Sequence, residues 1–386
     1  NSFCTLLKCD VEPKLLKMSA WRGWVVGALF TAAIVQASVQ RLSTSPTSID
    51  ASDVKYQLRG PNTVERTVAS ALAERVSVLD FGAHPSATVD VTVAFQNALN
   101  VRGDWPIEVF VPEGEYTLNG CVSIASRRTL HLMPGAVLIR RNCSSAACAM
   151  LNVMGAEAAL IGDRSSEVKV TCAGGADFGI VHLGPESLHK YLNVEWNRIS
   201  GVRIVGPSSG GIGLLVDSSE PFVGGSCYQN TIEDLVISDV DVGVRAVKYV
   251  NANRFSNLQM LSIGQYGVEF VNNTENSLSG IFVSSSRNIT AVIRGEGSGF
   301  NTFANVQSEP GGGKLMHFDA RSFQNRVDGH DNCPHGSVVH DPEFTWVSGG
   351  RIMVGNFSSA PLGYRRQLTV EGDAYIKSLE HGLPRV

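Results

Sequence analysis

A block of eight residues that begins with Asn recurs five times in the middle of this 386-residue chain. The blocks begin at Asn197, Asn230, Asn253, Asn276 and Asn301, and a weaker copy begins at Asn325. Successive blocks are 33, 23, 23, 25 and 24 residues apart, and the long first interval contains a Gly-, Ser- and Pro-rich insertion over residues 207–225. Repeats of about 20–50 residues are typical of solenoids, in which each unit contacts only its neighbours. The chain is therefore expected to consist of stacked units of roughly this period.

Each block carries apolar residues at the second, fifth and seventh positions after its Asn, as in Ile232, Leu235 and Ile237. This spacing, with many β-branched and aromatic side chains, indicates strands and not an amphipathic helix. A second short apolar run follows after a turn in several units, at residues 213–216, 243–247 and 267–271. Short strands repeated in register predict an all-β fold, a parallel β-solenoid.

The repeated Asn is expected to be structural. Stacked coils place equivalent residues about 4.8 Å apart, and side-chain amides at that spacing can bond to the coils above and below. A residue that recurs in every coil is expected to contribute to the stacking that all coils have in common. The column is therefore predicted to form an amide ladder at a turn.

The N-terminal part of the chain has the pattern of a secreted protein. The first Met is Met18, and residues 1–17 are interpreted as a leader outside the fold. After Met18 come Arg22, an uncharged apolar run over residues 24–35 and small residues before position 38, which predicts a signal peptide over residues 18–37. A signal anchor is the alternative, but a membrane span needs about 20 apolar residues.

Two helices and a first strand are expected before the repeats. Residues 38–75 are interpreted as a Ser- and Thr-rich linker followed by a short helix over 62–75 with one apolar face. Residues 76–81 are predicted to form the first strand of the solenoid. A short helix over Thr92–Leu99, capped by Asp90 or Thr92, is expected to cover the open end, where unpaired backbone would otherwise pair with other chains.

Six cysteines follow the predicted signal peptide: Cys121, Cys143, Cys148, Cys172, Cys227 and Cys333. An even number suits an oxidising compartment, although six cysteines allow about 15 connectivities and buried free thiols are the alternative. Cys143 and Cys148 flank a four-residue loop and are the expected pair. Four glycosylation sequons, at Asn142, Asn272, Asn288 and Asn356, agree with a secreted glycoprotein.

The charge balance argues against nucleic acid as a partner. The chain has 32 Lys and Arg against 36 Asp and Glu, a formal net charge of -4. No strongly basic surface is indicated. Apart from the apolar run of the signal peptide, no stretch is long and apolar enough to span a membrane.

Three segments near the N-terminus resemble a known superfamily. Residues 78–83, the expected helix over 92–99 and residues 109–116 are similar to the N-terminal region of the pectate-lyase-like superfamily, which includes the rhamnogalacturonase/epimerase-like domain. The resemblance implies a right-handed parallel β-helix over residues 76–340 and a carbohydrate substrate, often an acidic polysaccharide. The superfamily's acidic stretch before the helix keeps Asp90 and Thr92 here, whereas Ser86 and Val91 replace acids. This departure affects the local geometry around the helix.

The last part of the chain resembles a different class of protein. Residues 350–355 and 368–376 look like the short glycine-rich β repeats of tail fibres and other surface-attachment proteins. A separate small β module is therefore predicted over residues 341–386, with a possible role in assembly.

Candidate catalytic residues come from position within the repeat. The Asn, Asp and His motifs of the polygalacturonase family are missing, and so are the motifs of uronan lyases, which use a carboxylate-bound Ca²⁺. Asp239, Asp241, Arg287 and Glu309 fall near one offset from the repeat Asn, so they are expected to share a face over about 10–15 Å. A solvated turn is the alternative, since Asp is common in turns.

A second polar cluster lies near the end of the predicted solenoid. Residues 330–335 and 340–341 contain His330, His335 and His340 among acidic residues. Their spacing matches none of the common zinc patterns, so a polar terminal coil is the favoured interpretation over a metal site.

The expected function is that of a secreted carbohydrate-active protein, a glycoside hydrolase or polysaccharide lyase that acts on an acidic, pectin-like polysaccharide. Ca²⁺ is the cofactor expected if the reaction is eliminative. The alternative is a non-catalytic glycan-binding or surface-attachment protein, which the missing catalytic motifs favour. The sugar, the linkage and the oligomeric state stay open.

Overall fold

The computed structural model describes residues 50–371 except for gaps at 73–74, 87, 102–105, 144–147, 174–175, 177–178, 186–192, 209, 219–225, 285–289, 310–313, 319–321, 323–324, 331–337, 341–344, 349–351 and 355–369. The chain divides into two compact units, one up to Ala69 and one from Ser70 onward. The predicted leader, signal peptide and first part of the linker lie outside the described residues.

The first unit contains a hairpin that the sequence analysis did not predict. Strands β1 (Lys55–Gln57) and β2 (Glu65–Thr67) pair antiparallel, and Lys55 and Glu65 form an exposed ion pair of 2.9 Å. The helix expected over residues 62–75 is reduced to α2 (Val68–Leu72). The apolar face predicted for it is not buried, since Leu72 is 63% exposed and Val64, in the loop before β2, is 77% exposed. The prediction was wrong for residues 62–67 because a local hairpin takes up their backbone hydrogen bonds.

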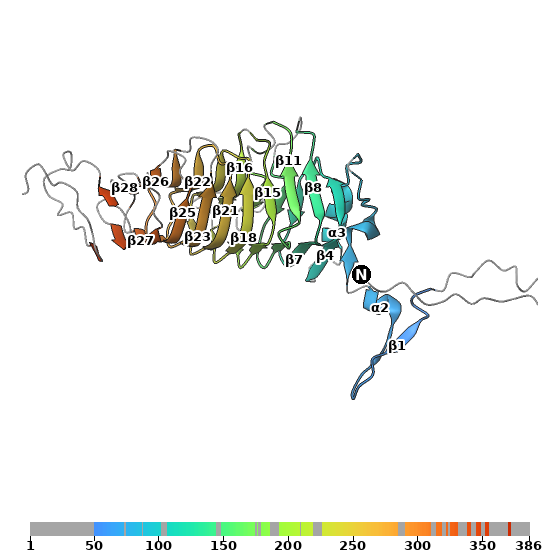
Figure 1. Ribbon diagram of the computed structural model, residues 1–386. Helices are drawn as coiled ribbons and strands as arrows, with labels where there is room; N and C mark the ends of the chain where they lie inside the picture. Colours follow the sequence, from blue (N-terminus) through green and yellow to red (C-terminus); the bar gives the residue numbers. More distant parts are fainter. Residues whose placement is uncertain are drawn as a thin grey trace, which may run out of the picture. The chain divides into compact units, whose positions relative to one another are not determined.

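The second unit is a parallel β-helix, as the repeat predicts, and Figure 1 shows its coils stacked one after another. The long sheet consists of β3 (Val76–Ser77), β4 (Ile107–Val111), β7 (Arg128–Leu132), β10 (Ala159–Ile161), β14 (Arg198–Ser200), β18 (Thr231–Ser238), β21 (Arg254–Leu261), β23 (Ser277–Ser284), β25 (Thr302–Ser308), β27 (Asn325–His330), β29 (Thr345–Ser348) and β31 (Val370–Glu371), joined by β5 (Gly114–Thr117), β8 (Ala136–Arg140), β11 (Glu167–Val170) and β15 (Arg203–Val205).

Two further sheets contribute to the coils, the smaller one to three of them. The second sheet consists of β6 (Val122–Ile124), β9 (Leu151–Val153), β12 (Val181–Leu183), β16 (Ile212–Asp217), β19 (Val242–Val247), β22 (Tyr266–Val271), β24 (Ala291–Glu296), β26 (Lys314–Phe318), β28 (Val338–His340) and β30 (Ile352–Val354). The small sheet consists of β13 (Val194–Glu195), β17 (Cys227–Tyr228) and β20 (Val250–Asn251). Neighbouring coils pair in parallel and in register.

The long strands bend at one position in each coil. Asp234 in β18, Asn257 in β21, Gly280 in β23 and Asn305 in β25 have φ values of 56°, 51°, 66° and 53°. One coil earlier, Gly201 (φ 70°) separates β14 from β15, and both of these strands pair with β18. Gly, Asn and Asp tolerate this left-handed conformation better than other residues. The column of bends turns the long sheet around the core.

The core is formed by the apolar positions that the repeat identified. Ile232, Leu235 and Ile237 are at most 1% exposed, and their equivalents in the neighbouring coils are buried in the same way. Four phenylalanines, taken alternately from the long and the second sheet, contact one another across the core, with ring centroids 5.8 Å apart for Phe255–Phe270, 6.0 Å for Phe270–Phe303 and 5.4 Å for Phe303–Phe318. Apolar side chains at equivalent positions let each coil bury its neighbour's apolar surface.

The Asn column forms the predicted ladder. The side-chain amide of each Asn from Asn197 to Asn301 donates to Oδ1 of the next, over 2.9–3.1 Å. The backbone N–H of each donates to the same Oδ1 atom. All six residues are at most 1% exposed, so the ladder satisfies buried polar groups that water does not reach.

The N-terminal end of the coil stack differs from the predicted strand over 76–81. Only β3 is a strand; residues 78–81 form the 3₁₀ helix η1 (Val78–Phe81), because Ser77 and Asp80 make a capping box. Helix α3 (Thr92–Asn100) follows, and Oδ1 of Asp90 accepts a hydrogen bond of 3.0 Å from the N–H of Thr92. Phe95 of α3 is buried against Tyr116, with ring centroids 5.6 Å apart.

The expected Cys143–Cys148 disulfide is wrong. Cys121 pairs with Cys148 and Cys143 pairs with Cys172, with Cα–Cα distances of 6.2 and 5.8 Å. The local loop is not closed on itself, because the cysteines that face each other come from adjacent coils, 27 and 29 residues apart. Cys227 is a free buried thiol, and Cys333 lies outside the described residues.

The strands described beyond residue 340 extend the solenoid. β29 pairs with β27 and β31 pairs with β29 in the long sheet, while β30 pairs with β28 in the second sheet. Most of residues 341–386 lies outside the described part of the chain, so the separate module expected there stays a prediction.

Candidate functional site

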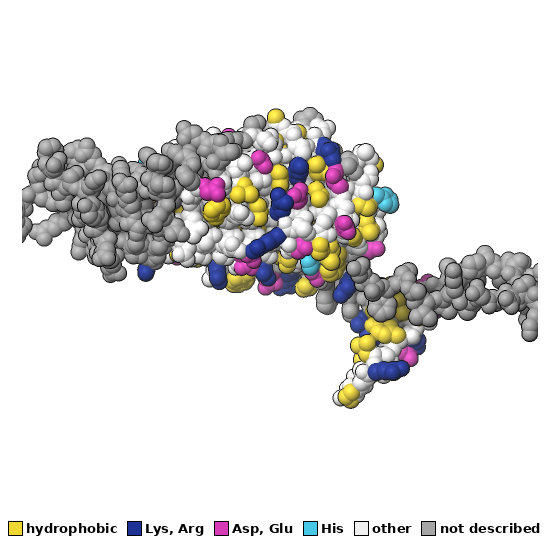
Figure 2. Space-filling model, viewed as in Figure 1, with side chains coloured by type: hydrophobic (Ala, Val, Ile, Leu, Met, Phe, Trp, Pro, Cys, Tyr) yellow, Lys and Arg dark blue, Asp and Glu magenta, His cyan; other side chains and the backbone are white. Residues whose placement is uncertain are grey.

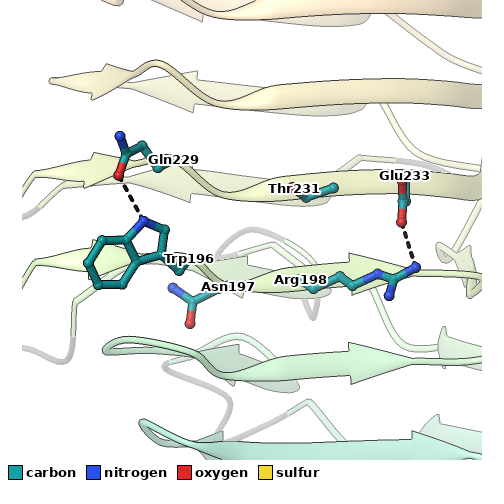
Figure 3. A pocket seen from close by; sticks show the side chains of 6 residues that line it. All are labelled: Trp196, Asn197, Arg198, Gln229, Thr231 and Glu233. Carbon is teal, nitrogen blue, oxygen red and sulfur yellow. Dashed lines mark hydrogen bonds and ion pairs between the residues drawn. The ribbon is translucent and has the colours of Figure 1, made fainter.

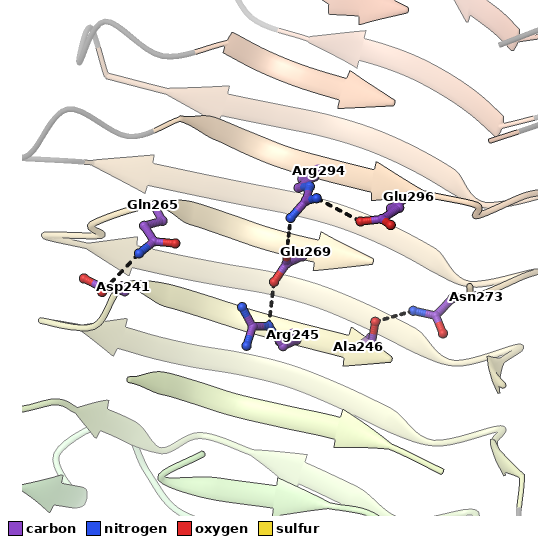
Figure 4. Close-up of polar contacts among 8 residues, drawn as sticks. All are labelled: Asp241, Arg245, Ala246, Gln265, Glu269, Asn273, Arg294 and Glu296. Atoms are coloured by element: carbon purple, nitrogen blue, oxygen red, sulfur yellow. Dashed lines mark hydrogen bonds and ion pairs between the residues drawn. The ribbon is translucent and has the colours of Figure 1, made fainter. Parts of the chain in front are cut away.

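Asp239 and Asp241 lie on the turn between β18 and β19. Asp239 has a φ of 59°, and its backbone carbonyl accepts a hydrogen bond of 3.1 Å from the N–H of Ser208. Oδ2 of Asp241 accepts a hydrogen bond of 3.3 Å from the side-chain amide of Gln265 in the next coil (Figure 4). The structure therefore brings these two acidic residues onto one turn.

Glu309 lies further along the coil stack, within the span of about 10–15 Å expected for the candidate residues. Glu309 follows β25, and its Oε2 accepts a hydrogen bond of 2.5 Å from the hydroxyl of Ser284. The strand register places Glu309 three coils from Asp239, which is about 14 Å. Arg287 lies outside the described residues. The catalytic role of all four residues stays a prediction.

A chain of ion pairs crosses the outward side of the second sheet (Figure 4). The Glu269 side chain is 4% exposed; one of its oxygens lies 2.5 Å from Nε of Arg245, and the other lies 2.5 Å from Nη1 of Arg294. Arg294 also contacts Glu296 at 2.8 Å and lies over the ring of Tyr266, 5.1 Å from its centroid. Because both oxygens of Glu269 are held by guanidinium groups, this carboxylate joins three coils.

A histidine and an aspartate meet on the same side of that sheet. Nε2 of His182 lies 2.7 Å from Oδ1 of Asp217, and Nδ1 lies 3.3 Å from Oδ1 of Asn152. A Cβ at Gly184 would come within 2.3 Å of His182 Nε2, so glycine leaves room for the pair. Since both ring nitrogens already face an oxygen, we interpret this group as a link between three coils.

A polar surface groove lies beside the Asn ladder. The residue before each ladder Asn from Asn197 to Asn301 has a positive φ, as at Trp196 (55°) and Gln229 (56°). Trp196 is 57% exposed, and its indole N–H donates a hydrogen bond of 2.8 Å to Oε1 of Gln229 (Figure 3). These two side chains, with Asn197, Arg198, Thr231 and Glu233, line a shallow groove of about 480 Å³, which we call the Trp196 groove.

Arg198 and Glu233 form the charged side of the Trp196 groove. Nη2 of Arg198 lies 2.7 Å from Oε1 of Glu233, and the Arg198 side chain is 55% exposed. In strand register, Arg198 is followed by Thr231 and then by Arg254 on the outward face of the long sheet. Arg254 is exposed and makes no ion pair with any residue that the structure describes. An aromatic face, a carboxylate and two guanidinium groups are thus accessible within three coils.

Two ionisable groups near this groove have shifted pKa values. A hydrogen bond with Glu195 raises the pKa of the Tyr228 hydroxyl, which lies in the small sheet. The side-chain amide of Asn257, together with the guanidinium of Arg164, lowers the pKa of Asp234 at the bend of β18. Asp234 therefore stays ionised through the neutral range.

No residue of the Trp196 groove belongs to a sequence pattern that predicts a site, and Asn197 belongs to the structural ladder. A signal was nevertheless present, because the residue before the ladder Asn is aromatic at Trp196 and Phe300 but Gln, Ala or Glu in the three coils between them. Around the described coils, side chains of both charge signs are mixed with apolar ones, as the face in Figure 2 shows. On this surface an exposed Trp is therefore a more specific indicator of a binding site than a single Asp is.

No metal-binding group of three or more His, Cys, Asp or Glu side chains occurs within the described ranges. Most of the His-rich cluster at 330–341 falls outside them. Across the same part of the chain, no helix has the length and apolar character that a membrane span requires.

Comparison with known proteins identifies structural neighbours. No family model matches the chain, and no curated protein matches it. Among solved structures, ORF18 of Geobacillus virus E2 has a TM-score of 0.50 and 14% identity over 75% of this chain and 60% of its own. Tailspike protein 2 of bacteriophage CBA120, represented by its enzymatically active domain, has a TM-score of 0.49 and 14% identity over 80% of this chain and 50% of its own.

A third neighbour is a ι-carrageenase complexed to ι-carrageenan fragments, with a TM-score of 0.44 and 14% identity over 64% of this chain and 57% of its own. The chain thus spans between half and 60% of the length of these three structures. The likeness to the Geobacillus virus protein is one of fold, and it agrees with the parallel β-helix described above.

Proposed function

We propose that this chain is a secreted carbohydrate-active protein of the pectate-lyase-like superfamily, and that it holds an acidic, pectin-like polysaccharide in the Trp196 groove. The observation that carries the proposal is the exposed indole of Trp196, fixed through its N–H to Gln229 beside the Arg198–Glu233 ion pair. The superfamily membership is supported by the N-terminal resemblance, whose segments form η1, α3, β4 and β5 around the first coil.

The groove offers the chemistry that a sugar chain needs. Sugar rings have apolar C–H faces that pack on an aromatic ring, and Trp is favoured where one side of a site is apolar and the other is wet. Each sugar hydroxyl both donates and accepts hydrogen bonds, and the Arg198–Glu233 pair presents both kinds of partner. Arg254, whose guanidinium is not held by a described carboxylate, supplies a planar fork for a uronate carboxylate.

Hydrolysis or elimination is the second step of the proposal. Asp239, Asp241, Arg287 and Glu309 are its candidate residues, and Asp241→Ala is the informative variant. Full cleavage activity in that variant would reject a catalytic role for Asp241. In an eliminative reaction Ca²⁺ would acidify the sugar C5 proton, but the described residues present no group of side chains that fits such an ion, so no step is assigned to it.

The alternative is a glycan-binding protein without catalysis. It is favoured by the pairing of Glu233 with Arg198 in the groove, because hydrolysis needs two carboxyl groups about 5–10 Å apart with distinct protonation roles. In this alternative the Trp196 groove keeps its role and only the chemical step is absent.

Secretion is part of the proposal and is supported by the two disulfides, which persist in oxidising compartments. Asn142 and Asn272 are exposed sequon residues and are the proposed glycosylation sites within the described chain. Mass spectrometry of the protein from a eukaryotic secretory host tests the two disulfides and the glycosylation of Asn142 and Asn272.

The experiment that tests the function is incubation of the purified chain with polygalacturonate, other polyuronides and neutral galactan, with and without Ca²⁺. Reducing ends and the absorbance of unsaturated uronates are followed together. New ends with the absorbance identify a lyase, and new ends without it identify a hydrolase. Retention on polygalacturonate without cleavage supports the binding alternative, whereas neither cleavage nor retention on any polyuronide rejects the proposal.

A further inference from the structure

A second groove lies on the same face of the long sheet, nearer to the N-terminal end of the coil stack. It has a volume of about 300 Å³ and is lined by Pro106, Ile107, Glu108, Arg127, Thr129 and Glu157. Arg127 and Glu157 form an exposed ion pair of 3.4 Å, and Glu108 contacts Nδ1 of His131 at 2.7 Å. We call it the Glu157 groove.

The two grooves occupy equivalent positions at different points along the coil stack. Glu157 has a φ of 60° and takes the turn position that Trp196 takes one coil later, because the residues before them, Ala156 and Glu195, pair in parallel. On the strand side, Thr129 of the Glu157 groove is separated from Arg198 of the Trp196 groove by one residue in register. Both grooves therefore run along one line parallel to the solenoid axis.

The residue between the two grooves is Ala159 in β10. Its side chain is a single methyl group, so the floor between Thr129 and Arg198 carries no bulky side chain. From β4 to β18 this line crosses four strand spacings, which is about 19 Å. That length accommodates several consecutive sugar rings of an extended chain.

We infer that the Glu157 groove and the Trp196 groove form one continuous binding trough for a linear polysaccharide lying along the solenoid axis. This inference rests on the proposed function and extends it to a second site. The sugar chain packs one ring on Trp196 and passes over Ala159, and its hydroxyls then bond to the Arg127–Glu157 and Glu108–His131 pairs. Because the polar side chains of these two pairs already contact each other, this end of the trough recognises hydroxyl groups. Arg254, beyond the other end, binds a carboxylate.

The variant that tests continuity is Ala159→Phe, which places a ring on the floor between the grooves without changing a residue that lines either one. Aromatic residues are well tolerated at partly exposed strand positions. The matched control is Thr302→Phe, because Thr302 is partly exposed in the same outward row, two coils beyond Arg254. Short and long oligogalacturonides are titrated into the full chain and both variants, together with Trp196→Ala.

One pattern of affinities supports the trough. The unchanged chain binds long oligomers about tenfold more tightly than short ones, and Ala159→Phe lowers the affinity for long oligomers to that for short ones. Thr302→Phe leaves both affinities unchanged. The opposite result is that Ala159→Phe binds long oligomers as tightly as the unchanged chain does, while Trp196→Ala still binds them more weakly. This result would show that the two grooves do not form one trough, and it would leave the proposed function standing. Absence of binding at every length overturns the proposed function itself.

Discussion

Oδ1 of Asn253 accepts two hydrogen bonds from Asn230, one from its backbone N–H at 3.0 Å and one from its side-chain amide at 2.9 Å. Asn253 in turn donates to Oδ1 of Asn276 at 3.1 Å and to the backbone carbonyl of Cys227 at 3.0 Å. All of these groups are buried, so each depends on the ladder for its partner. One side chain therefore satisfies polar groups in three coils.

Replacing Asn253 with Ala is expected to destabilise the solenoid by about 2–4 kcal/mol. The change leaves two buried donors of Asn230 without their acceptor, and a buried unsatisfied group costs about 1–3 kcal/mol. The midpoint of urea unfolding measures the loss. Ser277→Ala, at an exposed position next to a ladder residue, is the control and should stay within about 0.5 kcal/mol. Equal midpoints for the two variants would contradict the structural role of the ladder.

Glu269→Gln is expected to lower the free energy of unfolding by about 2 kcal/mol. Glu269 is 4% exposed between Arg245 and Arg294, and loss of its charge leaves Arg245 without this ion pair and Arg294 with Glu296 alone among the described carboxylates. Breaking a fully buried pair costs about 3–5 kcal/mol, and the arginines here are about a third exposed, which reduces the effect. Glu115→Gln, in an exposed pair with Arg141, should cost no more than about 1 kcal/mol. If Glu269→Gln lowers the free energy of unfolding no more than this control does, the ion pairs of Glu269 with Arg245 and Arg294 add no more stability than an exposed pair.

Peptide mapping without reduction is expected to link Cys121 to Cys148 and Cys143 to Cys172. Each bridge closes a loop of one coil, 27 or 29 residues, and removing one by paired Cys→Ser substitution should cost about 3 kcal/mol. A Cys143–Cys148 peptide in the map would contradict the pairing across coils.

The stabilising effect of Asp234 should disappear in acid. Its pKa is lowered by the Asn257 amide and by Arg164, so the ionised form is favoured by folding. A lowered pKa stabilises the folded state above the unfolded value of about 4, and this contribution is lost as the pH falls through the folded pKa. Asp234→Asn is therefore expected to unfold at lower urea concentration than the unchanged chain at about pH 7, and the difference should shrink towards about pH 3. A difference that grows in acid would contradict this account.

The fold could be predicted because the repeat encodes it directly. Ile232, Leu235 and Ile237 mark the inward positions of a coil, and the Asn before them marks the ladder, so a one-dimensional pattern determines the stacking. The wrong structural predictions concern segments that do not belong to the repeat. The hairpin at β1 and β2 and the capping box at Ser77 depend on local hydrogen bonds, and the disulfides depend on which cysteines face each other across coils.

The site was harder to predict for a physical reason. Asp239 and Asp241 are predicted to be catalytic because carboxylates serve as acids, bases and ligands in active sites. Acidic residues are, however, also common in turns. Trp196 lies at a turn position that is exposed from Trp196 to Phe300 in the described coils, and no periodic constraint selects its residue type. Its pairing with Gln229, and the neighbouring Arg198–Glu233 contact, exist only once coils 33 residues apart in sequence are stacked.

The most direct test of the account is the affinity of the full chain for polygalacturonate, measured by titration calorimetry for the unchanged protein, Trp196→Ala and Phe300→Ala. Phe300 is 50% exposed at the same turn position four coils away, so it is a matched control for the loss of an exposed aromatic ring. Trp196→Ala is expected to weaken binding by about tenfold, and Phe300→Ala is expected to bind like the unchanged protein. Unchanged affinity in a folded Trp196→Ala variant would contradict this expectation.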